Sequence, residues 1–123
     1  NGVAAIKGLM DDLMATGLQD KVTFATFNVF GRTLTKGSGN GRNHNQHHHT
    51  TLMVGRALKG GVVGGLVKVG KELGADGIDS RTGAASPTGD IPPEETLESV
   101  AKTLGRAIGL PAALVETRVE GGK

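Results

Sequence analysis

The chain has 123 residues, of which 14 are basic and 12 acidic, so its formal net charge is +2. The lack of cysteine excludes disulfides and thiolate metal sites, and no apolar run reaches the length of about 18 residues that a membrane-spanning helix needs. The even charge balance and the scarcity of aromatic side chains, three Phe and no Tyr or Trp, argue against nucleic-acid binding.

The first predicted elements are a helix and a buried strand. Ile6, Leu9 and Leu13 recur at helical spacing and predict an amphipathic helix over Asn1–Gly17. The run Lys21–Phe30 follows, rich in β-branched and aromatic residues on both alternating faces, which is typical of a parallel strand covered on both sides. A helix next to such a strand favours an α/β fold.

The middle of the chain is polar and rich in glycine. Gly31–His49 is predicted to be a loop, because it holds almost no apolar residues. Short strands are expected at Thr50–Val54 and around Val67–Val69, with a glycine turn at Gly60–Gly65 between them. The many Gly and Pro residues of Leu73–Pro93 predict a further loop.

A second amphipathic helix is predicted near the end of the chain, over Pro93–Ile108. Its apolar stripe includes Leu97, Val100 and Leu104, and its first turns are acidic, which the helix macrodipole favours. A short helical turn is expected at Ala112–Val115.

Four histidines, His44, His47, His48 and His49, lie within six residues. Imidazole is the commonest metal ligand in proteins and a proton donor or acceptor near neutral pH. Since neighbouring side chains of an extended segment point in opposite directions, at most two of the last three could share one site. A solvated polar loop is the alternative interpretation.

Arg32 and Thr33 follow directly after the predicted strand, where they could contact an anion, because arginine offers a planar fork for phosphate or sulfate. An ordinary surface arginine is the equally simple interpretation. The nearby Gly37–Gly41 segment lacks the spacing of a phosphate-binding loop, which favours a flexible connector.

Three short motifs follow one another along the chain: Phe30–Thr33 (Phe-Gly-Arg-Thr), Gly41–His44 (Gly-Arg-Asn-His) and Gly60–Gly64. With later motifs at Arg81–Ser86 and Gly89–Pro92, this order resembles the C-terminal part of a bacterial family of unknown function numbered 1501. The family is described as sulfatase-like, within the alkaline-phosphatase superfamily. The resemblance extends over nearly the whole chain from about Val22.

The resemblance implies an alkaline-phosphatase-like sandwich, in which a central sheet is flanked by helices and a divalent metal (Zn, Mn or Ca) lies at the strand ends. By position, the resemblance makes His44 a candidate metal ligand, and His48 of the histidine cluster is the second candidate. The candidate anion-binding residues are Arg32, Thr33 and Arg42. The resemblance places an acidic metal ligand where this chain has Val29, and an Asp where it has Asn43. Both departures remove negative charge that would balance a cation.

Three functional hypotheses follow: part of a metal-dependent hydrolase of phosphate or sulfate esters, a non-catalytic structural or binding relative, or a simple histidine-loop metal binder. The chain does not begin with Met, so we expect residues 1–123 to be a single domain or the C-terminal fragment of a larger α/β domain, inactive alone. Its partners would be the missing N-terminal part or other copies of the chain, because its strand would leave an open edge. The resemblance also implies export.

Overall fold

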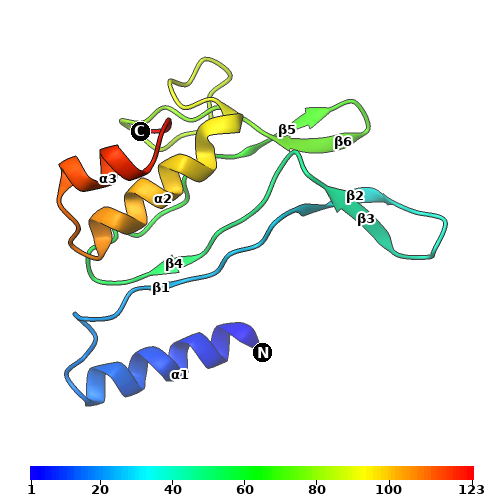
Figure 1. Cartoon of the computed structure of the whole chain (residues 1–123). Helices are drawn as coiled ribbons and strands as arrows, with labels where there is room; N and C mark the ends of the chain where they lie inside the picture. The colour runs from blue at the N-terminus through cyan, green and yellow to red at the C-terminus, as the bar shows by residue number, and fades with distance from the viewer.

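A computed structural model describes residues 1–123 as helices and short strands (Figure 1). The helices are α1 (Gly2–Ala15), the 3-10 helix η1 (Pro93–Glu95), α2 (Thr96–Ala107) and α3 (Ala112–Arg118). The strands are β1 (Phe24–Ala25), β2 (Gly31–Lys36), β3 (Arg42–Asn45), β4 (Met53–Val54), β5 (Leu66–Val69) and β6 (Glu72–Ala75). The mixed α/β class predicted from the sequence is confirmed.

The strands form three separate two-stranded antiparallel sheets, β1–β4, β2–β3 and β5–β6. The prediction of a buried parallel strand over Lys21–Phe30 is therefore wrong. Only Phe24–Ala25 is a strand, and Phe27 and Val29 are 68% and 89% exposed. The β propensity of this run is real, but burial on both faces needs a layer on each side, which residues 1–123 do not provide. No central sheet forms within the chain, because each strand pairs with only one other strand.

Three strands, β2, β3 and β6, lie wholly or mostly where loops were predicted. The polar segment Gly31–His49 contains the β2–β3 hairpin, whose turn is closed by the Gly37 amide donating to the Gly41 carbonyl at 2.7 Å. The predicted loop Leu73–Pro93 begins inside β6, which pairs with β5 in a hairpin. The β2–β3 hairpin is largely exposed, so its sequence lacks the apolar alternation that marks a half-buried strand. The strands predicted near residues 53 and 67 are confirmed as β4 and β5.

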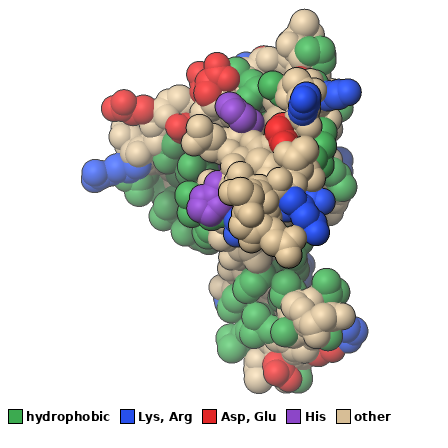
Figure 2. Space-filling model, turned by 90° about the vertical axis from the view of Figure 1, so that its right-hand side faces the viewer, with side chains coloured by type: hydrophobic (Ala, Val, Ile, Leu, Met, Phe, Trp, Pro, Cys, Tyr) green, Lys and Arg blue, Asp and Glu red, His purple; other side chains and the backbone are tan.

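The N-terminal helix α1 is confirmed within two residues of its predicted bounds. The Asn1 side chain caps it by accepting from the Ala4 amide at 3.0 Å, and Gly17 follows its end with a positive φ of 71°. No residue of α1 is buried, and Val3 and Met14 are more than half exposed. The helix lies apart from the other helices in Figure 1, and hydrophobic side chains cover much of its lobe in Figure 2.

The C-terminal helices α2 and α3 are both confirmed, and α3 is longer than predicted. The buried positions of α2 are Ser99 and Lys102, whereas Leu97 of the predicted apolar stripe is 54% exposed. The reason is that the chain end packs on the polar side of α2. There the Lys123 amide donates to Ser99 Oγ at 3.0 Å and Lys102 Nζ donates to the Gly122 carbonyl at 3.1 Å.

The molecule exposes more surface than its size requires. Its accessible surface is 8734 Å², against about 6,200 Å² for a compact monomer of the same mass. Only 7 of the 123 residues are buried, and the apolar core consists of Ile91 and Val115. Apolar residues of both amphipathic helices, such as Met14 and Leu97, therefore lie exposed.

Candidate functional site

The β2–β3 hairpin brings Arg32 and His44 together. The two residues are direct cross-strand partners in the antiparallel register. The His44 imidazole stacks on the Phe30 ring, with centroids 3.5 Å apart and planes at 17°, and the Arg32 guanidinium lies 5.1 Å from the Phe30 centroid. These three side chains, the Phe30 cluster, place a permanent cation and an imidazole on one aromatic ring.

Arg32 and His44 both remain available to a ligand. Arg32 is exposed and takes part in none of the ion pairs of the chain, and its one hydrogen bond runs from Nη1 to the Arg42 carbonyl at 3.3 Å. Because a guanidinium carries five N–H donors, most of them are free. His44 is exposed and its ring makes no hydrogen bond within the protein.

The other two candidate anion-binding residues, Thr33 and Arg42, make hydrogen bonds inside the hairpin. Arg42 Nη1 donates to the Thr33 carbonyl at 2.7 Å and also to the Leu34 carbonyl. Thr33 Oγ1 accepts from the Asn43 amide at 3.0 Å and donates to the Thr35 carbonyl at 2.8 Å. Contact of either residue with an anion stays a prediction, whereas Arg32 is the cation that the fold leaves free.

The Glu72 carboxylate ties the hairpin to β6. It accepts from the Leu34 amide at 2.6 Å and from Thr35 Oγ1 at 2.9 Å. These hydrogen bonds, with a smaller contribution from the Arg42 charge, hold the pKa of Glu72 below its usual value. The orientation of β2, and with it that of Arg32, is thus fixed by a residue distant in sequence.

His48, the second candidate metal ligand, is held in place by the backbone of β6. Its Nδ1 lies 3.0 Å from the Leu73 carbonyl oxygen, which can only accept, so Nδ1 carries the proton. The ring also fills the space beside Gly31, where a Cβ atom would lie 2.3 Å from Nε2. Its remaining nitrogen is therefore shielded by the Gly31 backbone.

The buried Asn45 anchors the segment His44–His49, the histidine segment, to the Leu73 carbonyl. Asn45 is 4% exposed; its Nδ2 donates to the Leu73 carbonyl at 2.8 Å, and its Oδ1 accepts from the His47 amide at 2.9 Å. Nothing in the sequence indicates this role of Asn45, since an asparagine in a polar run carries no signal of burial. These hydrogen bonds fix the backbone from which the His47 and His48 side chains extend.

His47 points to a different place, a cavity of about 300 Å³ that it lines together with Glu94 of η1. Glu94 was predicted only as an acidic first-turn residue of the second helix, because nothing local in the sequence links it to His47. Figure 2 shows histidine side chains at separate places on one face. The histidines close in sequence are thus distributed over several environments.

The residues of this chain do not by themselves fit a divalent metal. Nowhere do three His, Cys, Asp or Glu side chains come together as possible ligands. Protein sites for Zn²⁺ use three or four such ligands, and those for Ca²⁺ use more. The cross-strand neighbour of His44 is the cation Arg32, which disfavours a metal ion there unless anionic ligands are added. The roles of His44 and His48 as ligands stay predictions that need donors from outside residues 1–123.

Comparison with known proteins gives one result. A family model described as "Protein of unknown function (DUF1501)" matches residues 3–85, about two thirds of the chain. The match includes the Phe30 cluster and the whole histidine segment, whereas α2 and α3 lie beyond it. No curated protein and no solved structure matches the chain. None of its helices combines the length and the apolar character needed to cross a bilayer.

Proposed function

The chain belongs to the DUF1501 family, and on that premise we propose that it is part of a sulfatase- or phosphatase-like protein that acts on phosphate or sulfate esters. The single observation that carries the proposal is the exposed Arg32 guanidinium held beside His44 on the Phe30 ring. The order of the sequence motifs, which resembles that of this family, supports the same assignment. The resemblance further suggests a central sheet completed by further protein and an exported location, and both belong to the proposal.

Within this proposal, Arg32 is the residue that binds the anionic group. A guanidinium donates two parallel N–H bonds to neighbouring oxygens of a phosphate or sulfate, which fixes the orientation of the group as well as its position. The imidazole of His44, stacked on the same ring, then lies beside the bound group and can donate to, or accept from, one of its oxygens. The stacking on Phe30 restricts both side chains and lowers the entropy lost on binding.

The surface of the chain supports its place within a larger protein. About 2,500 Å² more area is exposed than a compact monomer of this mass would leave in water. That excess exceeds the roughly 800 Å² per partner of a standard protein interface. We propose that the N-terminal part of a longer polypeptide, or another copy of the chain, covers it and supplies the nucleophile and the metal ligands that residues 1–123 lack.

A non-catalytic relative is the second candidate, and a specific observation favours it. Val29, which occupies the acidic ligand position by resemblance, is 89% exposed, and Asn43 replaces the expected Asp. With no three-ligand group in the chain, the Phe30 cluster would bind an oxyanion without hydrolysing its ester. Arg32 has the same binding role in both candidates.

The test uses the intact protein that carries this chain. Titration calorimetry with inorganic phosphate and sulfate should show binding that weakens at least tenfold in Arg32→Gln, because the forked donor is lost. Arg81→Gln is the matched control, since it removes the same charge from an exposed side chain elsewhere. Equal binding by the two variants would overturn both candidates.

Metal content and turnover of p-nitrophenyl phosphate and sulfate separate the two candidates. Stoichiometric metal and turnover that both disappear in His44→Ala support the hydrolase. Arg32-dependent anion binding by a protein without bound metal or turnover supports the non-catalytic relative.

A further inference from the structure

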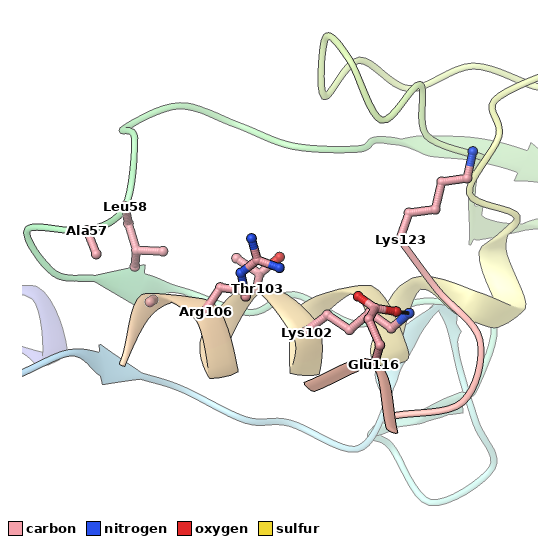
Figure 3. Close-up of a pocket in the computed structure, with 8 residues that line it drawn as sticks. Ala57, Leu58, Lys102, Thr103, Arg106, Glu116 and Lys123 are labelled. Atoms are coloured by element: carbon pink, nitrogen blue, oxygen red, sulfur yellow. Dashed lines mark hydrogen bonds and ion pairs between the residues drawn. The ribbon is translucent and has the colours of Figure 1, made fainter. Parts of the chain in front are cut away.

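A cavity of about 390 Å³ lies on the far side of the molecule from the β2–β3 hairpin, between α2, α3 and the segment that precedes Lys59 (Figure 3). Ala57 and Leu58 form its apolar wall, and α2 contributes Lys102 and Arg106. Its volume lies within the range of about 300–1,000 Å³ typical of small-molecule sites.

The polar lining of this cavity is predominantly positive. Its charged lining residues are three cations and one carboxylate, namely Lys102, Arg106, Lys123 and Glu116. Lys102 and Arg106 are four residues apart on α2, so their like charges lie on the same face. Glu116 balances the charge of Lys102, whereas no ion pair balances that of Arg106.

Two of the three cations already have partners. The Lys102 side chain is only 11% exposed, and its Nζ donates to Glu116 Oε2 at 2.5 Å and to the Gly122 carbonyl at 3.1 Å. Lys123 Nζ pairs with Asp90 Oδ2 at 2.5 Å. Arg106, by contrast, lines the cavity and makes no ion pair, and Figure 3 shows its guanidinium extending from α2 beside Thr103.

We propose that this cavity binds a small organic anion, an oxyanion head group on a compact apolar body. The free guanidinium of Arg106 binds the head group, because its donors match carboxylate or phosphate oxygens. Ala57, Leu58 and Ala107 contact the apolar body. Glu116 and Asp90 balance the charges of Lys102 and Lys123, so Arg106 supplies the net positive charge that attracts the head group. The site shares no residue with the Phe30 cluster and does not depend on the function proposed for it.

The test measures binding of phenyl phosphate and of benzoate to the protein by titration calorimetry. All measurements are made in an Arg32→Gln background, so that binding at the Phe30 cluster does not contribute. Arg106→Gln should weaken binding of both anions at least tenfold, and Arg106→Lys should restore part of it, since a point charge replaces the fork. Arg118→Gln is the matched control, because it removes an exposed arginine near the end of α3 without touching the cavity.

The probes also separate the head group from the body. Benzyl alcohol should bind at least tenfold more weakly than phenyl phosphate, whereas inorganic phosphate should bind measurably but less tightly. Equal effects of Arg106→Gln and Arg118→Gln, equal binding of benzyl alcohol and phenyl phosphate, or no saturable binding of either anion would each overturn the proposal. Lys102 is left unchanged in every variant, because its removal would leave the Glu116 carboxylate and the chain end unpaired and could unfold the region.

Discussion

Replacing Asn45 by Ala should destabilise the junction of β3 and β6 by about 2–3 kcal/mol. The amide makes two hydrogen bonds from a position that is 4% exposed, and each contributes about 1 kcal/mol. The Leu73 carbonyl would keep His48 Nδ1 as a donor, but the His47 amide would lose its acceptor at a part-buried site, which adds a desolvation cost.

The assay is urea unfolding followed by far-UV circular dichroism, because the chain has no Tyr or Trp to report by fluorescence. Asn43→Ala is the matched control: the same substitution on the same strand, at an exposed side chain that makes no hydrogen bond. Asn45→Asp should be at least as destabilising as Asn45→Ala above its carboxyl pKa. The carboxylate still accepts from the His47 amide, but it places a buried charge and a second acceptor against the Leu73 carbonyl oxygen. Equal unfolding midpoints for Asn45→Ala and Asn43→Ala would refute the anchoring role of Asn45.

Three further predictions concern residues that fix the same region or the loop behind it. Gly31→Ala would place a Cβ 2.3 Å from His48 Nε2 and force the ring from the Leu73 carbonyl, which should lower the free energy of unfolding by about 1–3 kcal/mol. The measurement is the NMR signals of the His48 ring, which should shift in Gly31→Ala and stay in place in the control Gly39→Ala. Gly89→Ala should lower the free energy of unfolding more than Gly31→Ala does, because its Cβ would lie 2.4 Å from the Ile78 backbone, which cannot rotate away. Comparison of the urea unfolding midpoints of the two variants tests this order. Since the pKa of Glu72 is lowered in the fold, its stabilisation is complete above its ordinary pKa of 4.5 and is lost as the pH falls through the lowered value. Glu72→Gln should therefore make the unfolding midpoint depend less steeply on pH below 4.5. An unchanged dependence on pH would contradict the stabilising role of the Glu72 carboxylate.

The candidate site could be predicted in its composition but not in its arrangement. The sequence indicated Arg32 and His44 as separate candidates, and the hairpin register made them cross-strand partners on Phe30. It grouped the four histidines, whereas contacts with β6 and η1 send His48 and His47 to different places. These contacts join residues about 25 or more positions apart, and no local pattern contains them.

The amino-acid sequence by itself determined the helices and the family. Apolar residues at helical spacing specified α1 and α2, because a helix is closed by bonds between near neighbours and its pattern is local. The motif order was sufficient to indicate the family that the family model then matched. Tertiary structure alone decided that Gly31–Asn45 is a hairpin, that β6 holds the histidine segment, and that Ser99 and Lys102 rather than the apolar stripe of α2 are buried. Strand pairing and burial depend on which distant segments supply the other half of each contact, and that choice is made by the folded chain as a whole.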